Sequence, residues 1–370
     1  MLLALMILAV AALAYANGAN DNFKGVATLH GSGALGFRSA LLLATIATLL
    51  GSATSIVLAN GLLQSFSGKG LVPAAMTQMP AFLAAVAGAG AVTILLATRL
   101  GLPTSTTHAL TGALLGISVF GLGNTAAMSA LWESFLRPLL LSPPLALVAA
   151  AVLYVLFART RRRLGVEADS CACVEPATEA QVCAPVATEA ALLRQAPAAR
   201  VTFGNIEACT APASGKAIRI TARQVLDGLH TASGTSVCFA RAVNDTPKIA
   251  ALAVATGGTT SWPFFLVATA MTCGGLFSAR RVAETMSKRI LPMNPGQGAT
   301  SNLVTAALVL GASRLGLPVS TTHVSCASIM GIGVVTRQAD LSVVRNILLA
   351  WLATLPLGAM LGASFFALLA

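Results

Sequence analysis

The decapeptide RLGLPTSTTH at residues 99–108 recurs as RLGLPVSTTH at residues 314–323, and the two copies differ only at the sixth position. Upstream of each copy lies a second shared motif, Asn-Asp-x-x-Lys, at residues 20–24 and again at residues 244–248. Two motifs that recur in the same order indicate an internal duplication. Matching polar interruptions in two halves are typical of the binding site of a secondary transporter.

The duplication predicts three parts. These are an N-terminal transmembrane repeat at 1–158, a polar linker at 159–222 and a C-terminal transmembrane repeat at 223–370. The linker is rich in Ala, Pro, Glu and Thr and shows no convincing amphipathic period, so we expect it to be loosely structured. Arg residues at 159–163 directly follow an apolar stretch, which places the linker in the cytoplasm by the positive-inside rule.

The composition is that of a membrane protein. Hydrophobic residues make up 56% of the chain and charged residues only 9%, whereas soluble domains carry about 25% charged residues. Apolar stretches long enough to cross a bilayer as a helix recur at 1–16, 39–62, 80–98, 139–158, 261–277 and 347–370. We therefore expect an all-α multi-pass protein of the cytoplasmic membrane, embedded in the lipid bilayer, with roughly eight to twelve passes.

The formal net charge of +11 does not indicate a nucleic-acid partner, because basic residues gather beside the apolar stretches, as in cytoplasmic loops. The first apolar segment lacks a basic start and a small-residue cleavage site, so we do not interpret it as a removed signal peptide. The linker contains Cys171, Cys173, Cys183 and Cys209. Disulfides are not expected in a cytoplasmic linker, and the spacing fits no standard zinc site. A soft-metal site is the alternative to a plain linker, and we expect no cofactor.

The repeated Gly-Leu-Pro-x-Ser-Thr-Thr-His stretch has the chemistry of an anion site. Gly and Pro end one helix, and the following Ser or Thr caps the next, predicted at 106–120 and 321–335. Such a start exposes N–H groups and a positive dipole end beside three hydroxyls. The hydroxyl residues are Ser105, Thr106, Thr107, Ser320, Thr321 and Thr322. The alternative is a capped turn at the membrane surface.

The helices that follow these turns are about fifteen residues long, short for a full span, so we predict re-entrant helical hairpins. His108 and His323 lie one turn into them. Each can contact the substrate or carry protons near neutral pH. Equally, each can serve only as a packing contact between helices.

The second motif places a carboxylate at membrane depth. Asp21 and Asp245 are costly there unless each is paired or faces water. The adjacent Asn20 and Asn244 supply amide oxygens suited to an alkali cation. Gly18 and Gly25 permit an unwound segment whose carbonyl groups can join them. A structural ion pair is the alternative.

Lys24 and Lys248 follow the aspartates by three residues, on the same face of a helical turn. They can neutralise Asp21 and Asp245, or they can attract an anion, occupy a cation's place or exchange a proton. Arg241 can attract an anion as well, although the corresponding position of the first half is Asn17.

The series GANDNFKG, LPTSTTH, FARAVNDTPKIAAL and LPVSTTH resembles the inorganic phosphate transporter (PiT) family, of bacterial or archaeal type, over both membrane halves. The resemblance implies a phosphate symporter with two inverted-topology repeats, broken helices and a homodimeric assembly. It implies that phosphate lies between the six hydroxyl residues, and that Asn20, Asp21, Asn244 and Asp245 arrange the coupling cation, H+ or Na+.

One departure concerns the last position of the second motif. The family pattern is Asn-Asp-x-x-Asn, and this chain has Lys24 and Lys248 in place of the final Asn. A fixed ammonium beside the sodium site puts sodium coupling in doubt. We hypothesise that the two Lys side chains partly replace sodium and that transport is coupled to protons, or to no sodium at one or both sites.

Other functions fit the sequence less well. A sulfate permease of the same family needs a similar oxyanion cradle. An intramembrane aspartyl protease also has two membrane-embedded Asp residues, but its two motifs differ from each other, whereas here one motif is duplicated. The chain contains no His-Glu-x-x-His zinc-protease motif. We therefore expect a transporter and no enzyme.

Overall fold

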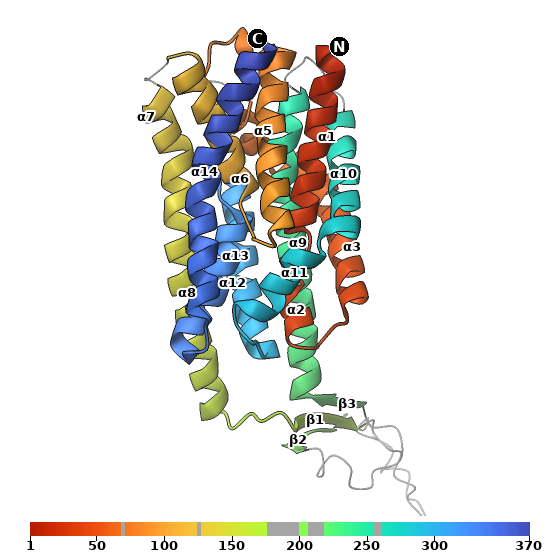
Figure 1. Cartoon of the computed structure of the whole chain (residues 1–370). Coiled ribbons are helices and arrows are strands. Elements are labelled where there is room, and N and C mark those ends of the chain that lie inside the picture. Colours follow the sequence, from red (N-terminus) through yellow and green to blue (C-terminus); the bar gives the residue numbers. More distant parts are fainter. Residues whose placement is uncertain (68–70, 124–126, 176–199, 206–217, 255–260) are drawn as a thin grey trace, which may run out of the picture. The chain divides into compact units, whose positions relative to one another are not determined.

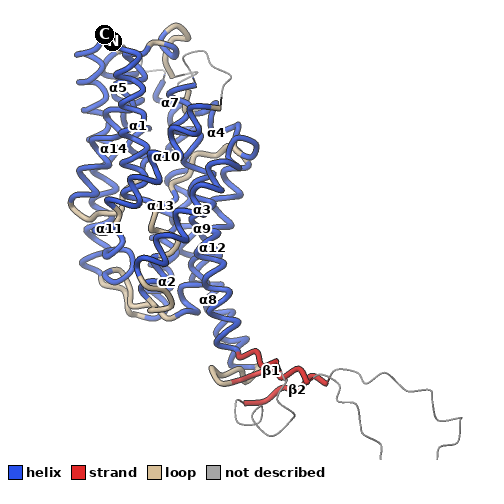
Figure 2. The backbone as a smooth tube through the Cα atoms, turned by 90° about the vertical axis from the view of Figure 1, so that its right-hand side faces the viewer, coloured by secondary structure: helices blue, strands red, loops and turns tan. Residues whose placement is uncertain are grey.

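The structure is a computed structural model of the chain, and it describes residues 1–67, 71–123, 127–175, 200–205, 218–254 and 261–370 (Figure 1). The chain divides into two compact units. The larger combines Met1–Val155 with His230–Ala370, and the smaller comprises Leu156–Leu229. Both halves of the duplication thus contribute to the larger unit, whose two chain termini lie at the same end (Figure 2).

The larger unit is helical (Figure 2). The helices of the first half are α1 (Leu2–Asp21), α2 (Ala27–Gly31), α3 (Phe37–Leu58), α4 (Asn60–Ser65), α5 (Pro80–Arg99), α6 (Thr106–Leu115), α7 (Ala127–Leu131) and α8 (Arg137–Arg163). Those of the second are α9 (Ala222–Val254), α10 (Trp262–Ser278), α11 (Arg280–Glu284), α12 (Pro295–Arg314), α13 (Thr321–Thr336) and α14 (Leu341–Leu369). Helices α8 and α9 extend from the larger unit into the smaller one.

The number of apolar spans is lower than the sequence suggests. Among the described residues, five helices are long and apolar enough to cross a membrane, and a sixth span results if α10 and the following segment Arg280–Arg289 count as one element bent by 66°. The roughly eight to twelve passes expected from hydropathy are thus not all present as long apolar helices. Helix α9 does not count as an apolar span because it contains the polar motif, and α6 and α13 do not count because they are too short.

The two decapeptides form matching turns between helices. Gly101 and Gly316 have φ of 70° and 69°, a left-handed conformation that glycine adopts without strain. Leu102 N–H bonds Ala97 O at 2.9 Å, and Leu317 N–H bonds Ala312 O at 2.9 Å, which closes α5 and α12 with the same hydrogen-bonded cap.

The predicted helix starts are confirmed. Ser105 and Ser320 are the N-caps of α6 and α13, and their hydroxyl oxygens accept from His108 N and His323 N at 3.1 Å in both cases. The predicted helix at 106–120 is α6 followed by a π-helical segment, Gly116–Gly121. The predicted helix at 321–335 is α13.

The two Asn-Asp motifs lie in different backbone settings. Helix α1 ends at Asp21, and a turn over 22–26 leads to α2. In the second half α9 continues through Asn244 and Asp245 despite Pro247. The expected helix break is therefore present in the first half and absent from the second.

Gly18 and Gly274 allow α1 and α10 to touch through their backbones. A Cβ at Gly18 would lie 1.9 Å from the carbonyl oxygen of Met271, and a Cβ at Gly274 would lie 1.9 Å from that of Tyr15. Gly18 lies inside α1 and serves close packing there, in place of the unwinding that the sequence suggested. Small residues at helix interfaces allow this approach in membrane proteins.

We expect Gly18→Ala to destabilise the protein by about 1–3 kcal/mol, because α1 and α10 must separate to admit the methyl group. Thermal unfolding of the purified protein in detergent measures the effect. Gly311→Ala is the matched control, because a Cβ at Gly311 in α12 meets nothing within 4 Å and Ala favours a helix over Gly by about 1 kcal/mol. An unchanged melting temperature for Gly18→Ala would contradict the close packing.

The smaller unit contains a sheet, so the all-α prediction is wrong for the linker. Strands β1 (Ser170–Glu175), β2 (Arg200–Asn205) and β3 (Ile218–Thr221) form an antiparallel sheet in the order β2-β1-β3. The described part of the linker is thus not loosely structured, because cross-strand pairing supplies order that its composition does not indicate.

The cysteines of the linker also differ from expectation. Cys171 and Cys173 are both disulfide-bonded, whereas reduced thiols were predicted. They sit two residues apart on β1, which places both side chains on one face of the strand. Cys183 and Cys209 lie outside the described residues. Within the described part of the chain, no group of three His, Cys, Asp or Glu residues could hold a metal ion.

Candidate functional site

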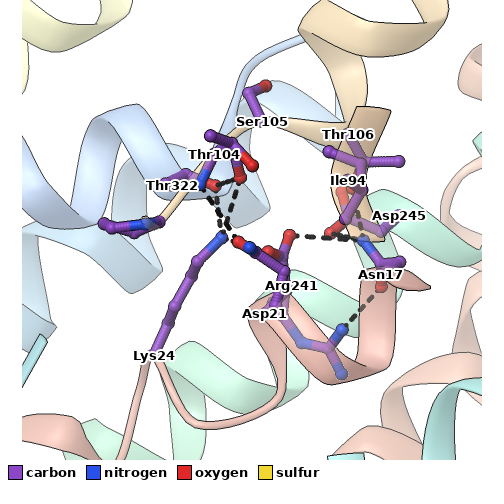
Figure 3. Close-up of polar contacts among 12 residues, drawn as sticks. Asn17, Asp21, Lys24, Ile94, Thr104, Ser105, Thr106, Arg241, Asp245 and Thr322 are labelled. Atoms are coloured by element: carbon purple, nitrogen blue, oxygen red, sulfur yellow. Dashed lines mark hydrogen bonds and ion pairs between the residues drawn. The ribbon is translucent and has the colours of Figure 1, made fainter. Parts of the chain in front are cut away.

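The two repeated motifs meet inside the larger unit (Figure 3). Among the described residues, the buried charged side chains are Asp21, Lys24, Arg241, Asp245 and Lys248, none more than 2% exposed. They lie beside the turns that precede α6 and α13. Buried charges of both signs among apolar helices make this cluster the candidate functional site.

Lys24 connects the two halves. Its ammonium group forms an ion pair with Asp21 and donates a hydrogen bond to the hydroxyl of Thr322 in the other half (Figure 3). It also lies 3.3 Å from the carbonyl oxygen of Thr104. The Thr322 hydroxyl donates to that same carbonyl at 2.6 Å.

Lys248, in the second half, makes the equivalent contacts to the first half. Its Nζ lies 3.4 Å from Asp245 Oδ1, 2.8 Å from the hydroxyl of Thr107 in the first half and 2.8 Å from Val319 O. Thr107 Oγ1 donates to Val319 O at 3.2 Å. Each Lys therefore forms an ion pair with the Asp of its own half, as one interpretation of the sequence held. Each also donates hydrogen bonds to a hydroxyl in the decapeptide of the other half and to a carbonyl in the decapeptide of its own half.

The two Asn residues of the motifs bind the turns. Asn20 donates to Thr98 Oγ1 and Leu102 O, both at 3.0 Å, and its own oxygen accepts from Thr104 N at 3.0 Å. These bonds fix the first turn against α1.

In the second half, Asn244 donates to Asp245 Oδ1 at 2.9 Å and to Val319 O at 3.2 Å, and it accepts from Ser313 Oγ at 3.1 Å. Ser313 corresponds to Thr98 in the duplication. Both Asn side chains thus position the polar groups around them.

Five of the six predicted hydroxyl residues take part in side-chain contacts at the two turns, and Thr321 has none among the described bonds. All six are buried, with exposures from 0 to 4%. Ser105 and Ser320 are occupied in capping their helices, Thr107 and Thr322 are bound to Lys248 and Lys24, and Thr106 Oγ1 accepts from Asn17 at 2.9 Å. The N-termini of α6 and α13 therefore point into one polar cluster.

The two His residues of the motifs touch each other. The ring centroids of His108 and His323 are 4.3 Å apart with an interplanar angle of 75°, and His323 lies 3.9 Å from the ring of Trp351. Trp351 Nε1 donates to Pro103 O at 3.2 Å. His108 Nδ1 and His323 Nε2 are buried and have no hydrogen-bond partner, so both can still bind a polar ligand.

Asn17 and Arg241 complete the cluster; the sequence indicated that Arg241 can attract an anion, and it assigned no role to Asn17. Asn17 Nδ2 lies 3.2 Å from Asp21 Oδ2 and 3.1 Å from Asp245 Oδ2, and Asn17 Oδ1 accepts from Arg241 at 2.9 Å (Figure 3). Each stands four residues before the Asp of its half, a spacing that could have indicated its position. Their mutual contact depends on the tertiary fold.

Each of the two ammonium groups occupies a position that resembles the site of a bound metal cation. A carboxylate, a hydroxyl and a backbone carbonyl surround each ammonium group. Oxygen atoms of these three kinds are what a hard metal cation binds. The buried N-termini of α6 and α13 lie next to the two ammonium groups and favour an anion.

Comparisons with known proteins agree on one family. The sequence model of the phosphate transporter family matches residues 17–362. A probable low-affinity inorganic phosphate transporter of Bacillus subtilis (strain 168) is 27% identical over 362 residues, which cover 97% of this chain and 94% of that protein. An Arabidopsis thaliana protein, inorganic phosphate transporter 2-1, chloroplastic, is 26% identical over 94% of this chain and 69% of its own length.

A solved structure, described as the sodium-dependent phosphate transporter, has a similar fold. Its TM-score to this chain is 0.73 at 22% sequence identity, and the match covers 100% of this chain and 98% of that one. The mostly helical fold of this chain is thus similar to that of a solved transport protein.

Proposed function

The chain belongs to the phosphate transporter family, and from this premise we propose that it carries inorganic phosphate across a membrane in symport with a cation, H+ or Na+. It is a multi-pass membrane protein and a transporter, not an enzyme. The observation that carries the proposal is the buried cluster in which two helix N-termini and six hydroxyl residues adjoin two Asp-Lys pairs.

In this proposal, phosphate binds between the hydroxyls of Ser105, Thr106 and Thr107 and those of Ser320, Thr321 and Thr322. N–H groups at the starts of α6 and α13 add donors and positive dipole ends. His108 and His323 contact the substrate or its proton through their unpartnered nitrogens. The bonds from Lys24 to Thr322 and from Lys248 to Thr107 link this site to the coupling site.

The coupling site consists of Asn20, Asp21, Lys24, Asn244, Asp245 and Lys248. We propose that the two ammonium groups partly replace sodium and that transport is coupled to protons, or to no sodium at one or both sites. The support is the oxygen environment of each Nζ atom, which is of the kind a sodium ion takes.

The larger assembly is also part of the proposal. The two halves act as inverted-topology repeats with re-entrant hairpins, working as a homodimer in the cytoplasmic membrane. The equivalent contacts of Lys24 and Lys248 support the two repeats, and the 66° bend at the end of α10 supports a broken span or re-entrant segment. Transporters with such repeats place the substrate near the midplane, between the repeats.

Uptake of labelled phosphate into proteoliposomes with imposed gradients tests the function and its coupling. We expect uptake to rise with an inward proton gradient and to stay unchanged when potassium replaces sodium. Protein-free liposomes are the control. Uptake that requires sodium and ignores the proton gradient would contradict the role of the lysines, and no uptake under any gradient would contradict the function.

Sulfate is the second candidate substrate, because it is also a tetrahedral oxyanion. Protonated phosphate can donate hydrogen bonds to Asp21 and Asp245, whereas sulfate cannot, and these carboxylates stand beside the hydroxyl cluster. We therefore favour phosphate. Competition by unlabelled sulfate and arsenate in the same uptake measurement distinguishes the two, with arsenate the stronger competitor if phosphate is the substrate.

A further inference from the structure

The charges of the buried cluster do not cancel. Two ion pairs, Asp21 with Lys24 and Asp245 with Lys248, are neutral as pairs. Arg241 is the remaining buried charged side chain among the described residues, at 1% exposure. A guanidinium group carries a positive charge in proteins, so the formal charges of the cluster sum to one positive charge.

Among the described residues, no carboxylate bonds Arg241 directly; Asp21 and Asp245 lie on the far side of the Asn17 amide and are paired with Lys24 and Lys248. The three recorded hydrogen-bond acceptors of Arg241 are neutral: Asn17 Oδ1 at 2.9 Å, Asn22 Oδ1 at 3.4 Å and Thr48 Oγ1 at 2.7 Å. Its Nε atom is buried without a partner. Burying a guanidinium among neutral groups costs free energy unless an opposite charge compensates for it.

The geometry joins Arg241 to the hydroxyl cluster through one side chain. Arg241 donates to the oxygen of Asn17, and the nitrogen of Asn17 donates to Thr106 Oγ1 at 2.9 Å at the start of α6. Polarisation of the Asn17 amide by the guanidinium strengthens the N–H donor that faces this hydroxyl. The positive charge therefore acts on the place where the anion is proposed to bind, without touching it.

We infer that Arg241 is the positioning residue that makes the site selective for an anion: its charge is the one that the bound oxyanion neutralises, and Asn17 transmits its effect to Thr106. This inference rests on the proposed function. The duplication provides its own test, because Asn17 and Arg241 occupy corresponding positions and contact each other. Exchanging them moves the guanidinium to the first half without changing the composition of the pair.

Four variants test the inference by labelled phosphate uptake, with KM and maximal rate measured separately. We expect Arg241→Gln, which removes the charge and keeps hydrogen-bonding groups, to raise KM about a hundredfold with a smaller change in maximal rate. Arg241→Lys and the double variant Asn17→Arg with Arg241→Asn should recover most of the affinity, because both keep a buried positive charge. Arg280→Gln, at an exposed ion pair with Glu284, should behave like the wild type.

A KM for Arg241→Gln within twofold of the wild type would overturn the inference. So would charge-keeping variants that fold, as judged by size-exclusion chromatography and thermal unfolding, yet bind phosphate as weakly as Arg241→Gln, because the role would then be structural. If Arg241→Gln does not fold, phosphate uptake by the double variant Asn17→Arg with Arg241→Asn is the deciding measurement. Phosphate uptake by the wild type in the same vesicles tests the proposed function. Failure of the proposed function can therefore be distinguished from failure of the inference about Arg241.

Discussion

We expect Asp21→Asn and Asp245→Asn each to reduce phosphate uptake at least about a hundredfold, since removing one partner of a buried ion pair costs about 3–5 kcal/mol. Asp21 holds the ammonium of Lys24, and Asp245 holds that of Lys248. Asn keeps an oxygen acceptor but carries no charge, so each ammonium is left among neutral acceptors only. Uptake of labelled phosphate into proteoliposomes is the measurement.

A folding control separates lost transport from lost structure. Size-exclusion chromatography in detergent should show that each single variant remains folded, at a lower melting temperature. The double variant Asp21→Asn with Lys24→Gln removes both charges and should recover the melting temperature but not the uptake. Glu133→Gln, at an exposed ion pair with Arg137, should change neither. Normal uptake in Asp21→Asn and Asp245→Asn would refute the proposed role of the two carboxylates.

We expect the double variant Lys24→Asn with Lys248→Asn to transport phosphate only when sodium is present. Removing the ammonium groups leaves Asp21 and Asp245 buried and without their cations, beside carbonyl and hydroxyl oxygens that can bind sodium. Uptake measured against sodium concentration, with potassium as the replacement ion, should rise to a plateau. The same measurement on the wild type should be flat.

Lys288→Asn is the matched control, because Lys288 is exposed and has no contact with the cluster among the bonds described above. It should leave the sodium dependence unchanged. A double variant that folds and transports without sodium would show that the lysines do not stand where a cation can bind. A wild-type protein whose uptake already requires sodium would also contradict the idea that the two lysines replace the cation.

Much of the fold follows from local sequence rules. The turns at Gly101 and Gly316, the caps at Ser105 and Ser320 and the short helices after them depend on residues close in the chain, and all were predicted. The Asp-Lys ion pairs also follow from a spacing of three residues within one helical turn. Short-range geometry is sufficient for these features.

Other features depend on contacts between distant parts of the chain. The crossing of Lys24 to Thr322 and of Lys248 to Thr107, and the meeting of Asn17 with Arg241, require both halves in place. The continuity of α9 across Pro247 overrides the local preference of proline to break a helix. The sheet of the linker arises from strand pairing, which the Ala- and Pro-rich composition does not indicate.

The crossed lysine bonds have a consequence for the history of the gene. After a duplication, two copies can normally accumulate substitutions independently. Here the hydroxyl on which each Lys rests belongs to the other copy, so a change in one Thr alters the surroundings of a residue that the other copy encodes. This mutual dependence disfavours independent substitution of the two Thr residues, and the decapeptides that contain them differ at one position of ten.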